Sequence, residues 1–308
     1  MKKYLAFFLV LLMAVSVLAA CGKDDSNNDS DKVTATAPVQ IPDITEPVAT
    51  EDNGNTLTST EQVTVIDNEL CTLTIDGLEY DELWGYNIKT SLVNKTSDKS
   101  LVASLESISV RNVQFDAIYY CEAAAGKTAK ENISLVTSDE EAEIIGDKPV
   151  FTLSFEVNDA DDYLSDALGE MKVTYFPFGG VEAGFYEREP LPSDKVLVDN
   201  DALSVTVTAI EDDDFMGYTL KLFIQNKTDK ELMVSAEDVS VNGIMADPYF
   251  AKAVAGGLSS FAQMCWLDSD FEELEITEVQ DIELTLRAYD YDDIFAGDVV
   301  KEKVTITP

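Results

Sequence analysis

The chain repeats itself, and this repeat limits the folds that are open to it. "GYNIK" at 85–89 matches "GYTLK" at 217–221, and "NKT" at 94–96 matches "NKT" at 226–228, always 132 residues apart. One extra residue near Ser97 changes the separation to 131. From there the matches continue to the end of both copies, as for Gly126 with Gly257 and Asp159 with Asp290. The sequence predicts a tandem duplication over 62–178 and 195–308, joined by a linker at 179–194.

Apolar and polar residues alternate along most segments of each copy. In the second copy, Leu203, Val205 and Val207 alternate with small polar residues, which is the period of a half-buried strand. About seven such runs fall within about 110 residues, the size and strand number of an immunoglobulin-like sandwich. The prediction is therefore all-β: two tandem immunoglobulin-like β-sandwich domains after a disordered N-terminal tether. The repeated Asn-Lys-Thr turn is interpreted as a soluble connection in which Asn tolerates unusual backbone angles.

The first 20 residues are typical of a secretory signal. Lys2 and Lys3 precede an apolar run over 4–17. Leu18-Ala19-Ala20-Cys21-Gly22 resembles the lipobox of bacterial lipoproteins, which implies cleavage before Cys21 and acylation of its thiol. An ordinary cleaved signal and an uncleaved anchor are the alternatives. We expect a protein anchored to the cell membrane by lipid, on its extracytoplasmic face.

Residues 21–61 are expected to form a disordered acidic linker. They are rich in Asp, Asn, Ser, Thr and Pro and contain no aromatic residue, so they cannot bury enough apolar surface to offset the entropy of ordering. A flexible coil of about 40 residues has a root-mean-square reach on the order of 35 Å.

The charge and composition exclude several classes of function. The chain has 59 acidic against 21 basic residues and a formal net charge of −38. Such a surface repels phosphate backbones, so nucleic-acid binding is excluded and contact with the membrane is expected through the lipid alone. There is no histidine, which removes Ser-His-Asp and Cys-His catalysis and imidazole zinc sites. Carboxylate-only chemistry, as in a glycoside hydrolase, stays open.

Two matching acidic clusters are candidate calcium ligands, since calcium takes six to eight oxygen ligands. The alternative is a solvated loop between strands. No other cofactor is expected. The clusters consist of Asp159, Asp161 and Asp162 in the first copy and Asp290, Asp292 and Asp293 in the second.

The connection between the copies is unusually aromatic. Residues 176–194 include three phenylalanines and a tyrosine, which a free linker would not keep in water. We expect these side chains to pack against both domains and fix their relative angle. The alternative is an aromatic platform for a glycan or a peptide. Its candidate residues are Trp84, Tyr119, Tyr120, Phe185 and Tyr186.

Three cysteines remain besides Cys21, and no pair of them is duplicated between the copies. Cys71 lies at an inward strand position, so burial as a small apolar residue explains it. A Cys71–Cys121 disulfide within the first domain is the alternative in an oxidising compartment, and it would leave Cys265 unpaired.

The second copy also carries a resemblance to a known family. The linked segments "GYTLKLFIQNKTDKELMVSAEDVSVNG", "AVAGGLSSFAQMCW" and "EVQDIELTLRAYD" resemble the immunoglobulin-like, telokin-like domains of uncharacterised bacterial lipoproteins. The first copy departs from this pattern where Arg111-Asn112 replaces the Asn242-Gly243 turn. The resemblance implies the fold and an extracytoplasmic accessory or binding role, without catalytic residues.

We therefore expect a non-catalytic surface lipoprotein that binds a protein, a peptide or a glycan through its tandem domains. A carboxylate-only glycoside hydrolase and a passive surface spacer are the alternatives.

Overall fold

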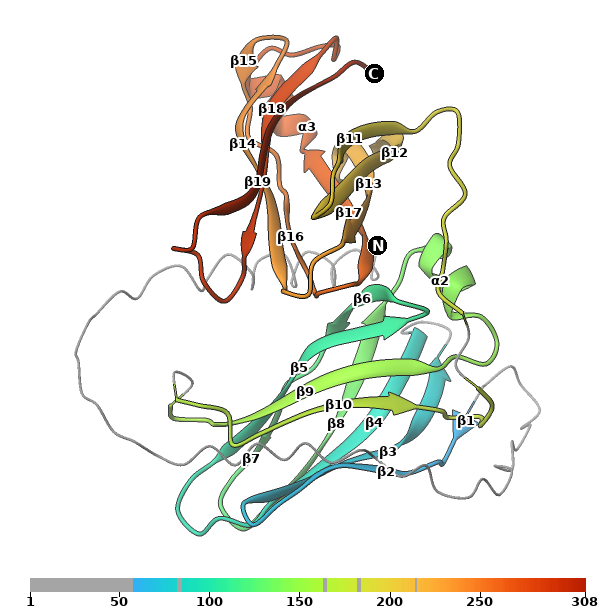
Figure 1. The fold of residues 1–308 in the computed structure, drawn as a ribbon, viewed down its shortest axis with the longest axis vertical. Coiled ribbons are helices and arrows are strands. Elements are labelled where there is room, and N and C mark those ends of the chain that lie inside the picture. The colour runs from blue at the N-terminus through green and yellow to red at the C-terminus, as the bar shows by residue number, and fades with distance from the viewer. Residues whose placement is uncertain (1–57, 82–84, 163–164, 182–183, 214) are drawn as a thin grey trace.

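The structure is a computed structural model that describes residues 58–81, 85–162, 165–181, 184–213 and 215–308. It confirms an all-β fold of sandwich type, with its strands in two groups stacked end to end (Figure 1). We call strands β1–β10 the N-terminal unit and β11–β19 the C-terminal unit. No helix within the described ranges is long and apolar enough to span a membrane. Cys21 lies outside those ranges.

The N-terminal unit contains two sheets that share one strand. One sheet has the order β2-β3-β4-β8, and the other has the order β10-β9-β5, with β6 hydrogen-bonded to both β5 and β8. The elements of the unit are β1 (Thr58–Ser59), β2 (Val63–Asp67), β3 (Cys71–Asp81), β4 (Gly85–Asn94), β5 (Leu101–Val110), β6 (Val113–Ile118), β7 (Cys121–Ala123), β8 (Thr128–Val136), α2 (Asp139–Ile145), β9 (Phe151–Asp159) and β10 (Gly169–Tyr175).

The C-terminal unit repeats this order. One sheet runs β11-β12-β13-β17, and the other runs β15-β14-β18-β19 with β16 also paired to β14. Its elements are β11 (Lys195–Asp199), β12 (Leu203–Asp213), β13 (Gly217–Asn226), β14 (Leu232–Val241), β15 (Ile244–Met245), β16 (Ala251–Val254), β17 (Ser259–Trp266), α3 (Asp268–Glu273), β18 (Ile282–Asp290) and β19 (Asp298–Ile306).

The duplication read from the sequence extends to strand register. Cys71 lies opposite Asn94 across β3 and β4, and Leu203 lies opposite Asn226 across β12 and β13. The β-bulge at 75–77 in the first pair recurs at 207–209 in the second. Each copy has more strands than the seven or so expected, because short strands such as β7 and β16 had too few residues to show an alternating pattern.

Each unit has its own hydrophobic core between its two sheets. The largest buried side chains of the N-terminal core include Phe151, Phe155 and Tyr175, and Trp266 fills the C-terminal core. The indole Nε1 of Trp266 donates to the carbonyl of Ala246 at 2.8 Å, so this large ring is buried without an unpaired donor. The two cores account for the apolar faces of the alternating strands.

The asparagine of the repeated Asn-Lys-Thr turn is buried, which corrects its interpretation as a residue that tolerates unusual backbone angles, whereas the lysine is exposed as expected of a soluble connection. Asn94 is only 2% exposed and adopts no left-handed backbone angle. Its Nδ2 donates to the carbonyls of Lys99 and Ala123, both at 2.8 Å, while its Oδ1 accepts from the backbone and hydroxyl of Thr96. One amide therefore ties the turn to the end of β7.

The start of the folded part also differs from the expected boundary of the tether. β1 pairs with β3, with Thr58 opposite Glu79 and Ser59 opposite Leu78. The hydroxyl of Ser59 donates to the carbonyl of Pro177. Ordered backbone therefore begins by residue 58 rather than 62. The polar composition of 58–61 concealed this, because a two-residue strand is held by backbone bonds alone.

Candidate functional site at the junction of the two units

The two units are joined by strand pairing. β6 of the N-terminal unit runs parallel to β17, with Val113 opposite Ser259 and Gln114 opposite Ser260. The backbone N–H of Ser259 donates to the carbonyl of Asn112 at 2.9 Å. β6 thereby joins sheets of the N-terminal unit to the β11-β12-β13-β17 sheet of the C-terminal unit in one continuous hydrogen-bonded sheet (Figure 1).

Gln114 is the central polar contact of this junction. The residue is 7% exposed, its Nε2 donates to the carbonyl of Ala253 at 3.1 Å, and its Oε1 accepts from the N–H of Ala255 at 2.8 Å. Its side chain thus replaces a backbone strand partner for β16. Beside it, Lys252 pairs with Asp116 at 2.6 Å, with the lysine side chain 11% exposed. These contacts fix how the units are oriented.

The linker adds a second set of contacts. Of the two adjacent aromatic residues at its centre, Tyr186 packs as the sequence predicts, and Phe185 does not. Tyr186 packs against Phe223 and Phe261 of the C-terminal unit, while its N–H donates to the carbonyl of Arg111 at 2.9 Å. The guanidinium of Arg111 lies 5.7 Å from the centre of the Tyr186 ring. Phe185, in contrast, is 74% exposed, so its ring does not help to set the relative angle of the two units.

Arg111 and Asn112 are the positions where the first copy differs from the Asn242-Gly243 turn of the second. Both have left-handed backbone angles, with φ of 53° and 56°, and the corresponding Asn242 and Gly243 have φ of 51° and 78°. The two hairpins therefore turn alike, although arginine is an uncommon residue at such an angle. Contacts with the linker hold the Arg111 turn in place, since its Nε donates to the carbonyl of Gly184 at 3.1 Å.

An acidic patch lies beside the junction on the N-terminal unit. Glu106 occupies a β-bulge of β5, next to Glu156 of β9, and Glu156 lies directly opposite Glu170 of β10. The pKa of the Glu106 carboxyl is raised to about 7, first by burial and then by the charges of Glu156 and Glu231. The neighbouring carboxylate of Glu156 therefore disfavours the charged form of Glu106.

The C-terminal unit has a different set of charges at the same three positions. The residues 131 positions later are Glu237, Arg287 and Lys301. There the carboxylate of Glu237 pairs with Arg287 at 2.9 Å and with Lys301 at 3.0 Å. These bonds hold the pKa of Glu237 below its ordinary value. In the C-terminal unit, Glu237 is thus neutralised by two cations of the same unit. In the N-terminal unit, the three equivalent positions hold three carboxylates and no cation.

One aromatic side chain of the C-terminal unit, Tyr291, lies close to the acidic patch. Tyr291 follows β18, its N–H donates to the carbonyl of Glu231 at 3.0 Å, and its pKa is raised by burial and by the charges of Glu231 and Glu106. In the same loop Ile294 is 50% exposed and Phe295 is 87% exposed. A large ring kept in water is a feature of interaction surfaces.

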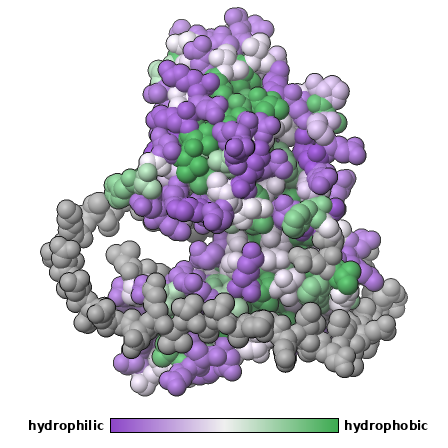
Figure 2. Space-filling view, in the orientation of Figure 1, coloured by the Kyte–Doolittle hydropathy of each residue, from purple (hydrophilic) through white to green (hydrophobic). Residues whose placement is uncertain are grey.

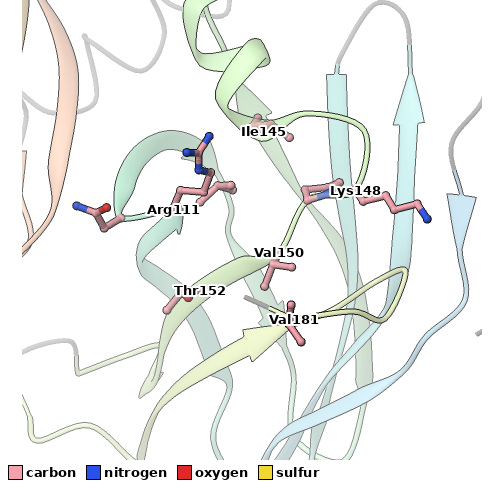
Figure 3. A pocket seen from close by; sticks show the side chains of 9 residues that line it. Arg111, Ile145, Lys148, Val150, Thr152 and Val181 are labelled. Atoms are coloured by element: carbon pink, nitrogen blue, oxygen red, sulfur yellow. The ribbon is translucent and has the colours of Figure 1, made fainter. Parts of the chain in front are cut away.

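A small cavity opens on the other side of the Arg111 turn (Figure 3). Its volume is about 70 Å³, far below the several hundred Å³ of a typical ligand pocket. Lys148 extends away from Arg111 in the figure, so the two cations do not converge. The cavity therefore does not form a ligand site. It is lined by Val110, Arg111, Asn112, Ile145, Lys148, Pro149, Val150, Thr152 and Val181.

The calcium candidates lie in two equivalent loops, where lysines already contact them. Asp159 pairs with Lys99 at 2.9 Å, and its other oxygen accepts from the N–H of Asp161. Asp290 pairs with Lys230, and its second oxygen likewise accepts from Asp292. Within the described ranges, no three Cys, Asp or Glu side chains are grouped closely enough to hold a metal ion.

The proposed aromatic platform is not assembled. Tyr119 points into the N-terminal core, where it packs edge-on against Phe155 and its hydroxyl lies 3.1 Å from that of Thr90. Burial raises the pKa of the Tyr119 phenol. Tyr120 is 54% exposed and donates to Glu122, and Tyr186 belongs to the junction. Trp84 lies outside the described residues.

The structure contains no disulfide among its described cysteines. Cys71, Cys121 and Cys265 are all buried free thiols. Burial raises the pKa of each thiol, to about 11 for Cys265, which disfavours the reactive thiolate. The Cys71–Cys121 bridge considered from the sequence is not formed, whereas the inward position of Cys71 is confirmed.

Comparisons with known proteins add little. No family model matches the chain, and no curated protein matches it. A crystal structure of the YadV chaperone is similar over 71% of this chain and 92% of its own, with 14% sequence identity and a TM-score of 0.22.

Sequence reasoning missed the residues that build this site. Gln114 lacks the charge or motif that marks a functional residue, and its role depends on a strand in the other unit. The acidic patch did leave a signal. When the copies are aligned with an offset of 131 residues, Glu156 corresponds to Arg287 and Glu170 corresponds to Lys301. The charge is therefore reversed at two neighbouring strand positions.

Proposed function

We propose that this chain is a non-catalytic, extracytoplasmic lipoprotein that binds a partner protein or peptide at the junction of its two units. The partner would supply a basic side chain to the acidic patch and an apolar side chain to the loop of Phe295. The observation that carries this proposal is the set of carboxylates Glu106, Glu156 and Glu170, at the positions where the sister unit holds Glu237, Arg287 and Lys301.

Physical chemistry favours an external cation at this patch. Like charges directly opposite each other on a sheet, such as Glu156 and Glu170, are destabilising. Beside them, the pKa of Glu106 is raised by burial and then by the charge of Glu156. An arginine or lysine from a partner would relieve it, as Arg287 does within the C-terminal unit. The rigid junction supports the same proposal, because the patch and the apolar loop come from different units and need a fixed orientation to act together.

The alternatives receive less support. A glycoside hydrolase needs carboxyl groups about 5 to 10 Å apart across a cleft, whereas Glu106, Glu156 and Glu170 lie on adjacent strands of one sheet. A glycan platform would need aromatic faces side by side, and Tyr119 and Tyr186 are occupied in separate packing contacts. A passive spacer gives no reason for the 87% exposure of Phe295. Figure 2 shows that the visible face is largely hydrophilic, with several hydrophobic areas among the polar residues.

The binding test uses the purified chain on arrays of basic-apolar peptides, acidic peptides and glycans. We expect binding to peptides that combine Arg or Lys with large apolar residues, and its loss in the Glu156→Arg variant, which restores the arginine of the sister unit. Glu283→Arg is the matched control, because it makes the same change of charge at an exposed position of β18. Equal loss in both variants would indicate only a general charge effect, and binding to glycans alone would refute the proposal.

The anchor has a separate test. Mass spectrometry of the mature N-terminus should find an acylated Cys21, and Cys21→Ser should release the protein from the membrane fraction. A mature chain that begins at another residue would refute the lipoprotein assignment without affecting the peptide-binding proposal.

A further inference from the structure

The junction within the chain shows how one unit docks on another. The hairpin that joins β5 and β6 inserts Val113 and Gln114 beside Ser259 and Ser260, at the start of β17. All four residues are buried, with exposures of 0%, 7%, 3% and 0%. The hairpin of one sandwich unit is therefore seated against the turn between β16 and β17 of the next.

Because the chain is duplicated, a second hairpin of the same kind exists in the C-terminal unit. The hairpin between β14 and β15 turns at Asn242 and Gly243, and its Ile244 and Met245 correspond to Val113 and Gln114. Ile244 is 40% exposed and Met245 is 62% exposed. This hairpin lies at the end of the C-terminal unit that faces away from the N-terminal unit (Figure 1).

A second turn of the receiving kind exists in the N-terminal unit. Thr128 and Ala129, at the start of β8, correspond to Ser259 and Ser260. Thr128 is exposed and Ala129 is partly exposed, whereas their counterparts are buried by the docked hairpin. The turn between β7 and β8 lies at the opposite end of the molecule from β15 (Figure 1).

We propose that copies of this chain associate head to tail, with the β14–β15 hairpin of one copy docked on the β7–β8 turn of the next. The chain has two hairpins and two receiving turns, and one hairpin and one turn are already docked on each other within the chain. One free hairpin and one free turn are therefore left at opposite ends. A contact between two different surfaces leaves one of each free after every addition, so it continues from copy to copy, either into a closed ring or into an open filament.

The chemistry of the two free surfaces fits such a contact. Ile244 and Met245 would leave water, and a methionine adapts well to an irregular surface. Asp247 occupies the position of Asp116, and the buried Cys121 occupies that of its partner Lys252. The cations that the receiving turn offers to Asp247 are instead the exposed Lys127 and Lys130. Met245 cannot reproduce the two hydrogen bonds of Gln114, so the contact between copies is weaker than the one within the chain.

Net charge sets the conditions in which the association is visible. At −38 per chain, copies repel each other over a distance that salt shortens. The association should therefore strengthen as ionic strength rises, which is opposite to the behaviour expected for peptide binding at the acidic patch. This difference separates the two proposals experimentally.

The test is directional cross-linking of the full chain. One preparation carries Ile244→Cys and another carries Thr128→Cys, which are the counterparts of the Val113 and Ser259 pair. After mild oxidation at high salt we expect a cross-linked dimer in the mixture only. A dimer from Ile244→Cys alone would show a symmetric contact and overturn the proposal. So would an equal yield when Val196→Cys, at an exposed position of β11, replaces Ile244→Cys.

A second measurement needs no new cysteine. In sedimentation at high salt, the average mass of the unmodified chain should rise with concentration, and Met245→Asp should remove that rise without changing the circular dichroism of the fold. A mass that stays monomeric at every concentration, or an identical rise in Met245→Asp, would overturn the proposal.

Discussion

Asn94 and Asn226 make the same set of hydrogen bonds in their respective units. Each Nδ2 donates to two backbone carbonyls, those of Lys99 and Ala123 in one unit and of Lys230 and Val254 in the other. Each Oδ1 accepts from the threonine two residues later. The exact repeat "NKT" is thus preserved by a buried amide that ties three segments together.

Asn226→Ala should destabilise the C-terminal unit by about 2 to 4 kcal/mol, because it leaves two buried carbonyls without a donor. Lys227→Ala is the matched control. It removes a surface pair with Asp199 and should cost less than about 1 kcal/mol. Denaturant unfolding followed by Trp266 fluorescence measures both, and equal losses would contradict the assigned role.

Gln114→Ala should loosen the junction and leave both cores intact. The N–H of Ala255 would lose its acceptor, so its hydrogen exchange should accelerate by about tenfold or more, for a hydrogen bond worth about 1 to 3 kcal/mol. Met245→Ala alters the corresponding residue of the free hairpin and should leave that exchange unchanged. Unaltered exchange in Gln114→Ala would show that the junction does not depend on this side chain.

The pH dependence of stability should differ in sign between Glu106 and Glu237. The pKa of Glu106 is raised in the folded state, so its ionisation costs stability as the pH rises from about 4.5 through about 7. Glu106→Gln should remove this loss and be the more stable protein at pH 8. Partial exposure of Glu106 to solvent limits the size of the effect.

Glu237 serves as the opposite case. Its pKa is lowered, so its contribution is present above the unfolded pKa and is lost as the pH falls through the folded value. Glu237→Gln should therefore be less stable than the unmodified protein at neutral pH, with the difference disappearing in acid. Parallel pH profiles for the two variants, from thermal unfolding, would contradict this charge assignment.

Calcium should leave the melting temperature unchanged. The carboxylates of Asp159 and Asp290 are paired with Lys99 and Lys230, and a cation would have to displace an ammonium group at each site. A rise in melting temperature with added calcium, reversed by a chelator, would instead support the calcium hypothesis. Lys230→Met then tests which site binds, since it frees Asp290.

The fold was predictable because its signals are local or repeated. Alternation along β12 and β18 marks strands, and the matches between copies reveal the duplication without any partner structure. The short helices and strands were not predictable. β15 contains two residues, and the seven residues of α2 depend on a capping box between Ser138 and Glu141 that lies in a polar loop.

The site was less predictable, since it depends on contacts between distant residues. Exposed and buried aromatic residues look alike in a sequence, so Tyr119 was grouped with Phe185 although one is part of the core and the other is in solvent. Gln114 contacts residues about 140 positions away. The reversed charges at Glu156 and Glu170 needed only the alignment of the copies, which makes such internal comparison useful for other duplicated chains.

The parallel pairing of β6 with β17 covers two residue pairs, whereas β12 and β13 are paired along ten. If the chain is pulled between its N-terminal end and its C-terminal unit, the pairing of β6 with β17 should therefore break first, while each sandwich remains folded. The molecule would lengthen in a distinct early step and recover when the load is removed, protecting both cores from mechanical unfolding.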